Sequence, residues 1–525
     1  MSAEPSAPGE SAPRVDGPPD ETWHELDRRS PAVAAVVAAG LTLGSAVPVF
    51  AGVRDEGRPL WQVLAVIAVA FVVVVGSAAL IERVRWRHTR YRITDERVEL
   101  RFSWVMHRLR SVPRDRVRTV DITANPLLRL FGVVRVQIGT GQQGGRDNQL
   151  VLNPLDRRQA EHLRAELLTR TRPAPTDVAP DGPAAPASAP AIAELRWSWI
   201  RYAPVSVTTP ILGAAAFGAV LQVADWFGLQ ETVLGEAGEL LRDLPVLALL
   251  GLVLAVGIVL GVVGSLGLFV ELWWGYRLTG EHGMFRVRRG LLTRRSLSLD
   301  ERRLRGVEVV EPLGARTLRA AKVDVVATGL RAAGDKERSD PKTLLPAAPI
   351  AVAHRVAARI LGEQRCPTES VRLRRHPVAA RRRRLLRALA STLLPAGVLA
   401  LLGLSPFAVI VLVVGVPVAL GLALDAYRNL GHGITGGYVV TRYGAGSRRT
   451  VALQRAGVIG WTVTSSPFQR RAGLITLAAT TAAQKGAYPI RDVGADDGLR
   501  FAEEAVPGLL TPFLEPVPRS TSPES

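Results

Sequence analysis

Six long runs of apolar residues dominate the pattern of the chain, and they come in pairs. The runs hold about 19 to 25 residues each and cover Ala32–Val53 with Leu60–Ile81, Ala203–Ala224 with Val246–Val270, and Leu385–Leu404 with Pro406–Leu424. A helix of that length matches a hydrocarbon core of about 30 Å. Apart from Arg387 the runs contain no Lys, Arg, Asp, Glu or His. Helices on a soluble core carry a polar stripe, so the pattern predicts six membrane spans in three hairpins.

Charges outside the runs predict which way the hairpins face. Arginines follow the second run and precede the fifth, whereas the connector Asp225–Asp243 holds five acidic residues and one arginine. Cytoplasmic loops carry the excess of Arg and Lys in membrane proteins. We therefore expect a multi-pass plasma-membrane protein with both termini cytoplasmic. Six tryptophans near the ends of the runs are expected to anchor the spans at the membrane interface: Trp61, Trp86, Trp197, Trp199, Trp273 and Trp274.

Each hairpin is followed by a β-like stretch, and the three stretches resemble one another. Each opens on a tyrosine with a threonine three positions later, at Tyr91, Tyr276 and Tyr438. Alternating apolar strands follow at Val117–Val120, Val307–Val310 and Val458–Thr462, and then a proline at Pro126, Pro312 and Pro467. The tyrosine-to-proline intervals are 126 − 91 = 35, 312 − 276 = 36 and 467 − 438 = 29. Repeated short strands with turn signals predict an all-β roll or barrel, used three times.

The end of each β-stretch repeats as well. A small residue begins a strand that ends in threonine eight positions later, at Gly132, Ala320 and Gly473. Amphipathic helices are expected to close the first two stretches, at Asp156–Thr169 and Ala348–Leu361, with a shorter version around Gly498–Val506 in the third.

These patterns divide the chain into hairpins, β-modules and low-complexity segments. The hairpins are predicted at 31–82, 195–274 and 385–425, and the β-modules at 83–170, 275–365 and 426–508. Residues 171–194 form a Pro/Ala-rich linker, and residues 366–384 form a basic juxtamembrane segment. We expect residues 1–30 and 509–525 to be disordered.

Two-span hairpins that each precede a Tyr-x-hydrophobic-Thr β-module resemble the membrane-flanked bacterial pleckstrin-homology (PH) domain family. Three such units, covering roughly residues 30–510, look like its YdbT-like members. The resemblance implies PH-like rolls of about seven strands, each closed by a C-terminal helix. The second module departs in having Ala320 at the small-residue position, and the third has the shorter tyrosine-to-proline interval, so one of its strands or loops is expected to be cut down. The family implies no enzymatic activity and no residue-level binding site. It does imply a hetero-complex with a smaller single-module relative.

Composition narrows the class of partner. The 525 residues combine a mean hydropathy of +0.16 with a formal charge of +19. A basic excess of this size favours an anionic partner, either nucleic acid or a lipid surface, although an Arg- and Ala-rich chain also reflects genome composition. The single cysteine, Cys366, excludes a disulfide framework and is expected to be a free buried or linker thiol.

Motifs for catalysis are weak, so we predict no catalytic, cofactor-binding or metal-binding residue and no enzyme. The run Gly139–Gly144 reads G-x-G-x-x-G, but Leu150–Leu152 follows as a strand where a dinucleotide site needs a helix, so a hairpin loop is the better interpretation. The eight histidines are scattered, without zinc-ligand spacing. Ser111, Ser296 and Ser298 lack the context of a nucleophile. The spans lack the ionisable residues of a proton or ion pathway.

Clusters of arginine are the remaining signal. Eight candidate contacts for anionic lipid headgroups lie next to the fifth run: Arg372, Arg374, Arg375, Arg381, Arg382, Arg383, Arg384 and Arg387. Such contacts contribute about 1 kcal/mol per basic residue, but the same cluster equally fits a signal that only fixes topology. A second patch belongs to the early strands of the second module, where an ordinary solvated face is an equal alternative: Arg286, Arg288, Arg289, Arg294, Arg295, Arg302, Arg303 and Arg305. Nucleic acid is not expected, since no groove-reading helix is evident.

Together these features predict a non-enzymatic membrane scaffold. Its three cytoplasmic PH-like modules would bind anionic lipid headgroups or partner proteins at the inner leaflet, in envelope homeostasis or defence. The alternative is a subunit of a lipid or peptide transport complex whose spans form a pathway. Glycines that permit close helix packing in the fourth span fit both hypotheses: Gly251, Gly257, Gly261 and Gly264.

Overall fold

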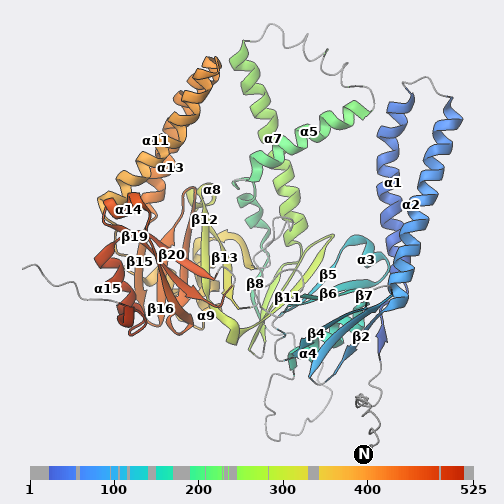
Figure 1. Ribbon diagram of the computed structural model, residues 1–525, viewed down its shortest axis with the longest axis horizontal. Helices are drawn as coiled ribbons and strands as arrows, with labels where there is room; N and C mark the ends of the chain where they lie inside the picture. The colour runs from blue at the N-terminus through green and yellow to red at the C-terminus, as the bar shows by residue number, and fades with distance from the viewer. Residues whose placement is uncertain are drawn as a thin grey trace, which may run out of the picture.

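The structure is a computed structural model of the 525-residue chain. It describes residues 23–513 except 55–58, 95, 105–106, 115–116, 118, 140–148, 170–189, 207, 227–228, 230–234, 236–244, 282, 329–341 and 484–485. Three β-modules lie in a row, and three helical hairpins leave them on the same side (Figure 1).

All six apolar runs contain helices. The hairpins consist of α1 (Ser30–Arg54) with α2 (Leu60–His88), α5 (Thr208–Trp226) with α7 (Val246–Trp273), and α11 (Val378–Leu401) with α12 (Ser405–Ile410), η5 (Val411–Gly415) and α13 (Val416–Arg428). Among the described residues, four helices are long and apolar enough to cross a membrane: Leu60–His88, Gly251–Trp273, Val378–Leu401 and Ser405–Arg428. The apolar stretches Ser30–Ala46 and Thr209–Asp225 are shorter. The prediction of six spans is therefore supported in part.

The third run begins later than predicted. Residues Trp197–Tyr202 form a 3₁₀ helix, η3, and α5 starts only at Thr208. Trp199 and Trp273 are buried in the core of the second β-module. The prediction that these two tryptophans anchor the membrane interface is wrong, whereas Trp197 and Trp274 are exposed and contact each other edge to face.

The predicted close packing by glycine occurs between α5 and α7. A Cβ atom on Gly261 would lie 2.3 Å from the carbonyl oxygen of Thr209, and one on Gly213 would lie 2.0 Å from that of Gly257. Glycine is therefore required at this crossing, while Gly251 meets nothing within 4 Å.

Each β-module contains two three-stranded antiparallel meanders. The first module has β2 (Thr89–Ile93), β3 (Arg97–Ser103) and β4 (His107–Pro113), then β5 (Thr119–Ala124), β6 (Val133–Gly139) and β7 (Gln149–Asp156). The second has β9 (Arg277–Glu281), β10 (Met284–Arg289) and β11 (Arg294–Asp300), then β12 (Leu304–Pro312), β13 (Ala320–Ala327) and β14 (Thr343–Pro349). The third has β15 (Gly431–Thr435), β16 (Tyr438–Tyr443) and β17 (Ser447–Gln454), then β18 (Val458–Thr464), β19 (Leu474–Thr481) and β20 (Ala487–Gly494).

Helices close the modules as predicted. They are α4 (Arg157–Thr169), α9 (Ile350–Leu361) and α15 (Ala495–Ala505). Each buries its apolar face, with Leu163 of α4, Val356 of α9 and Phe501 of α15 in the respective cores. A short helix also follows the first strand of each second meander: α3 (Pro126–Leu130), α8 (Leu313–Thr317) and α14 (Pro467–Arg471).

The first strand of each roll precedes its hairpin. Strand β1 (His24–Glu25) pairs with β2, and β8 (Ala191–Glu194) pairs with β9. In the third module Arg374 forms the corresponding bridge to His432 of β15. Each hairpin is thus an insertion between the first two strands of a roll, so the predicted module boundaries leave out one strand, and residues 191–194 belong to a sheet rather than to the linker.

The opening of the third repeat differs from the prediction. Tyr91 lies in the first strand after its hairpin and Tyr276 directly precedes it, but Tyr438 lies in the second strand. The equivalent residue is His432 of β15, which is followed by Thr435 as the tyrosines are by their threonines. The interval to the proline is then 467 − 432 = 35. The third module is therefore not shortened, and the apparent difference came from aligning the wrong strand.

Neighbouring modules share continuous sheets. Strand β5 of the first module pairs antiparallel with β11 of the second, from Arg294 opposite Ala124 to Leu299 opposite Thr119. Strand β12 of the second module pairs in the same way with β17 of the third, from Gly306 opposite Leu453 to Pro312 opposite Ser447. We call these contacts the first seam and the second seam. They join the strands into a seven-stranded and a six-stranded sheet, with smaller sheets at the two ends of the row.

Candidate functional site

The eight arginines predicted to contact lipid do not form one surface. Six of them are exposed: Arg372, Arg374, Arg375, Arg381, Arg382 and Arg387. Arg374 forms an exposed ion pair with Glu504 at 2.8 Å. Within the described part of the chain, the other five exposed side chains have no ion-pair or hydrogen-bond partner, so lipid contact stays a prediction for them.

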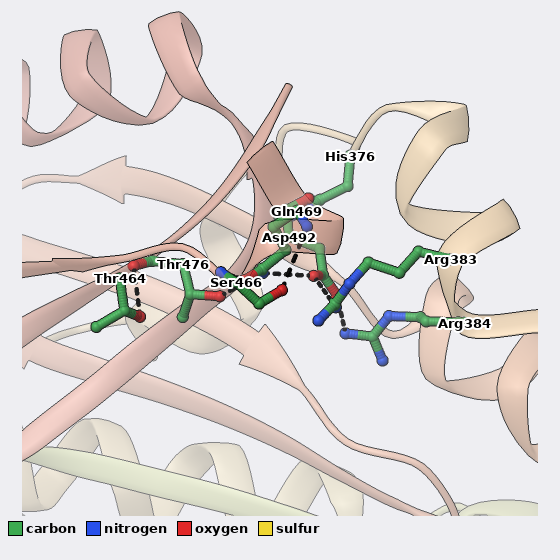
Figure 2. A network of polar contacts seen from close by, with 8 residues as sticks. All are labelled: His376, Arg383, Arg384, Thr464, Ser466, Gln469, Thr476 and Asp492. Carbon is green, nitrogen blue, oxygen red and sulfur yellow. Dashed lines mark hydrogen bonds and ion pairs between the residues drawn. The ribbon is translucent and has the colours of Figure 1, made fainter. Parts of the chain in front are cut away.

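Arg383 and Arg384 bind a buried carboxylate instead (Figure 2). Arg383 reaches Oδ1 of Asp492 at 2.5 Å and Arg384 reaches Oδ2 at 2.8 Å. Asp492 is 2% exposed, and Gln469 of α14 donates to it at 2.9 Å. A β-bulge in β20 gives Asp492 a φ of 57°, which Asp tolerates better than most residues. These two arginines fix the start of α11 to the third β-module.

Two buried histidines extend this network. The Nδ1–H of His376 faces the carbonyl oxygen of Asp492 at 3.1 Å, so His376 Nε2 is left to accept from His432 Nδ1 at 3.0 Å. Within the described chain the Nε2 atom of His432 has no partner. Burial, and then the nearby His376 and Arg374, lower the pKa of His432 to about 3. Burial also lowers the pKa of His376, so both rings are neutral at pH 7.

We expect the third module to lose stability in mild acid. An unfolded histidine has a pKa near 6.5, so between pH 6.5 and 3 the unfolded chain binds more protons than the folded one, and the stability present above pH 6.5 is lost as the pH falls. The loss reaches about 1.4 kcal/mol per pH unit for one histidine. Hydrogen exchange of β15 in the full chain, measured from pH 7 to 5 and corrected for intrinsic rates, tests this. The His432→Asn variant serves as the control with a flatter profile, and identical profiles for the two proteins would contradict the assignment.

A second group of arginines lines a cavity of about 570 Å³ at the first seam. Its walls come from β5, β6 and α4 of the first module and from β10 and β11 of the second. One carboxylate, Glu161, lines it together with eight arginines: Arg129, Arg157, Arg164, Arg286, Arg288, Arg289, Arg294 and Arg295. We call this cavity the seam pocket.

Few protein groups neutralise these arginines. Glu161 lies 3.6 Å from Arg157. Ser296 accepts from Arg164 at 3.2 Å and from Arg286 at 3.5 Å, but its hydroxyl carries no charge. In the described chain the side chains of Arg288, Arg294 and Arg295 have no hydrogen-bond or ion-pair partner. Glu161 and Glu281 offset part of the charge of Arg164 and Arg286, and Asp121 offsets part of that of Arg289. Among the described residues the pocket therefore holds more positive than negative charges.

Burial and mutual repulsion disfavour the charged forms of the arginines in the pocket. Desolvation, followed by Arg164 and Arg288, lowers the pKa of Arg286 to about 10. Desolvation and Arg295 lower the pKa of Arg289 to about 10, although Asp121 partly offsets them, and Arg289 also stacks over the Trp273 ring at 4.3 Å. An anion within the pocket would relieve this repulsion, since it favours the charged forms.

A comparison with the second seam shows why positive charge is in excess at the first. There, Glu308 pairs with Arg449 at 2.7 Å and Glu311 pairs with Arg448. Glu308 lies four residues before Pro312, and the residue four before Pro126 in the first seam is Ile122, which lines the pocket. Glu311 corresponds in the same way to Asn125. In the second seam Arg448 lies opposite Glu311, and Arg449 lies opposite Val310 but pairs with Glu308. In the first seam Arg294 and Arg295 lie opposite the uncharged Ala124 and Thr123.

A comparison with protein-family models matches three segments of the chain. The bacterial PH domain model covers residues 34–171, 232–364 and 385–504, one for each hairpin with its roll. The chain belongs to the bacterial PH domain family. Neither the curated proteins nor the solved structures contain a match. The family suggests modules that bind lipids or proteins, and we refer below to the three β-modules as PH modules.

The seam pocket lies beside the end of a candidate span. Trp274 and Gly275, which follow α7, line it. The turn between β10 and β11 is attached to α7, because Glu271 accepts from the backbone N–H groups of Leu292 and Thr293 at 3.0 Å. The carbonyl of Trp274 accepts from Gly290 at 2.9 Å. The second PH module therefore holds its part of the pocket next to the point where α7 ends.

Sequence reasoning found half of the pocket. The predicted patch on the second module supplies five of its arginines: Arg286, Arg288, Arg289, Arg294 and Arg295. The other three arginines of the predicted patch do not line the pocket, and one of them, Arg303, donates to the carbonyl oxygen of Val117 at 2.9 Å. Arg129, Arg157 and Arg164 were missed, because nothing in the sequence signals that the first PH module lies against the second. Pairing of β5 with β11 brings them together.

The remaining sequence motifs contribute no chemistry to the site. Cys366 is buried as expected, with its Sγ 3.0 Å from the Thr368 hydroxyl. Residues 140–148, which include most of the Gly139–Gly144 run, lie outside the described residues. Where the chain is described, no group of three His, Cys, Asp or Glu residues is arranged to hold a metal ion.

Proposed function

We propose that this protein is a non-enzymatic, multi-pass scaffold of the plasma membrane whose seam pocket binds the phosphate-bearing headgroup of an anionic lipid. The observation that carries the proposal is the set of eight arginines with one carboxylate around a single cavity. Guanidinium groups bind phosphate oxygens bidentately and are the preferred residues for such ligands. A headgroup would supply the negative charge that the pocket lacks.

The position of the pocket favours a lipid over a soluble anion. Its rim includes Trp274 and Gly275 at the end of α7, where the chain leaves a helix of membrane length. A headgroup held in the membrane surface would reach this rim without leaving the bilayer. Arginines near an anionic surface contribute about 1 kcal/mol each.

The common direction of the hairpins supports a single orientation in the membrane. The hairpins leave the row of PH modules on one side, and the N-terminal strand β1 lies with the modules (Figure 1). With the arginine-rich flanks on the cytoplasmic side, both termini and all three PH modules would be cytoplasmic. The complex with a smaller single-module relative stays a prediction.

A binding experiment on the full chain in mild detergent tests the pocket. The probes are dihexanoyl phosphatidylglycerol, dihexanoyl phosphatidylcholine and inorganic phosphate, measured by isothermal titration calorimetry. We expect the anionic lipid to bind, and the Arg286→Gln/Arg288→Gln variant to bind it about tenfold more weakly or worse, since about 1 kcal/mol per arginine is lost. The melting temperature of the variant should be unchanged or higher, because two crowded charges are removed.

The matched control is Arg381→Gln/Arg382→Gln, which removes the same charge from two exposed arginines of the sequence-predicted cluster. Unchanged binding in this control supports the seam pocket. Loss of binding in the control alone would transfer lipid recognition to the cluster beside α11. Equal affinity for phosphatidylcholine would rule out recognition by charge, and tighter binding of phosphate than of the lipid would favour a soluble anion.

A further inference from the structure

Both seams of the protein use the same pair of strands. The first strand of one module's second meander, β5 or β12, pairs with the last strand of the next module's first meander, β11 or β17. In each case the short helix after the first of these strands contacts the turn before the second. Arg129 of α3 donates to the carbonyl oxygen of Leu291 at 2.7 Å. In the second seam the backbone N–H of Leu313 in α8 donates to the carbonyl oxygen of Gly446 at 2.5 Å.

Among the strands that the structure describes, one of each kind has no seam partner. In the third PH module the equivalent of β5 and β12 is β18, which pairs only with β19 at the edge of its sheet. In the first PH module the equivalent of β11 and β17 is β4, which pairs only with β3. The modules that carry these two strands lie at opposite ends of the row (Figure 1), so β18 does not reach β4 of its own chain.

The surfaces around both edges have the character of unfilled seams. Ile459 and Val463 of β18 are 64% and 45% exposed, and Phe468 of α14 is 72% exposed. Phe468 follows its proline as Leu127 of α3 and Leu313 of α8 follow theirs. At the other end, Leu109 of β4 is 61% exposed and the nearby Trp104 58%. Apolar edge strands with unpaired backbone groups favour pairing with another chain.

The geometry points to head-to-tail self-association, in which β18 of one chain pairs antiparallel with β4 of a second copy. The contact would be a third seam, with α14 in the place that α3 and α8 hold in the first two. It is heterologous, so every copy offers one β18 and one β4, and the assembly grows until it closes as a ring. All hairpins leave the modules on one side. A second copy added with the same arrangement of modules would therefore place its hairpins in the same membrane.

The test exploits the polarity of this contact. One variant, Ile459→Lys/Val463→Lys, places charges on the β18 edge, and a second, Leu109→Lys, places one on the β4 edge. All three positions are exposed, so both variants should fold, which melting curves check. Mass photometry of the full chain in detergent and in large nanodiscs measures the oligomeric state.

We expect the unmodified chain to form dimers or larger assemblies and each variant to associate at least tenfold more weakly. An equimolar mixture of the two variants should form a dimer and stop there, because only the intact β18 of one and the intact β4 of the other remain. A monomeric unmodified chain, variants that assemble normally, or a mixture that stays monomeric would each overturn the proposal.

Cysteine cross-linking provides a second measurement that does not depend on the lysine variants folding. Ser465 and Leu109 correspond to Ala124 and Arg294, which lie opposite each other in the first seam. Ser465→Cys and Leu109→Cys chains, co-expressed and oxidised in membranes, should therefore give a covalent dimer. The buried native Cys366 is the internal control, and each single variant alone should remain uncross-linked. A dimer formed equally by Ser465→Cys alone would indicate a symmetric contact between two β18 edges and overturn the head-to-tail arrangement. Cross-linking only to a different, smaller chain would overturn self-association.

Discussion

Replacing Asp492 with alanine is expected to destabilise the third PH module by about 3–5 kcal/mol, the usual cost of removing one partner from a buried ion pair. Arg383 and Arg384 would keep their charges in a site where their side chains are only 17% and 15% exposed. Gln469 would lose an acceptor as well. Alanine would also have to adopt the φ of 57°, which costs about 1–2 kcal/mol in an L-residue other than Gly, Asn or Asp.

Hydrogen exchange of β19 and β20 in the full chain measures this loss. An effect of 3–5 kcal/mol corresponds to exchange that is faster by about two to three orders of magnitude, at 1.4 kcal/mol per factor of ten. The matched control is Arg381→Gln/Arg382→Gln, which alters the two preceding, exposed arginines of the same helix and should change exchange by less than about threefold. If Asp492→Ala behaved like this control, the network would not hold α11 to the module.

The Asp492→Asn variant separates charge from backbone conformation. Asparagine tolerates the left-handed region, so its cost reports the loss of the two ion pairs. Combining it with Arg383→Gln and Arg384→Gln should recover part of the loss, since no unpaired charge then remains buried. Failure to recover any stability in the triple variant would assign the role of Asp492 to its backbone position rather than to its charge.

Breaking the second seam should have the next largest effect, and its two sides should differ. The carboxylate of Glu308 is 2% exposed, whereas the Arg449 side chain is 33% exposed. Desolvation disfavours the charge of Arg449, but Glu308, Tyr443 and Asp324 outweigh it, so the pKa of Arg449 is raised. Arg449→Ala removes the ion-pair partner of this buried carboxylate, and we expect a cost of about 3 kcal/mol or more. Glu308→Ala leaves an arginine that water reaches, so its cost should be smaller.

Exchange of β12 and β17 amides reports on this seam, and the first seam supplies the control. Arg294 occupies the position opposite Ala124 that Arg449 occupies opposite Val310, but it has no carboxylate partner in the described chain. Arg294→Ala should therefore leave the first seam as stable as before or more so. Equal losses from Arg294→Ala and Arg449→Ala would contradict the assignment of different roles to the two seams.

Local features of the sequence determined a large part of this protein. The apolar runs fixed where the hairpin helices lie, because a helix of membrane length is visible as a continuous stretch of residues. Alternating strands and the eight-residue spacing from a small residue to a threonine predicted three rolls with closing helices. The family resemblance follows from the same patterns and is confirmed by the three matched segments. One local alignment failed: Tyr438 was matched to Tyr91 because His432 stands where the pattern expects tyrosine.

Only the tertiary structure decided how these parts join. Backbone hydrogen bonds between strands carry no side-chain signature, so the pairing of β5 with β11 and the strand before each hairpin left no trace in the pattern. The same holds for charge. Arg383 and Arg384 read as part of one basic cluster, yet their partner Asp492 lies more than 100 residues away in sequence. Whether an arginine is a structural ion pair or a free cation depends on which carboxylate the fold brings to it, and composition alone does not contain that information.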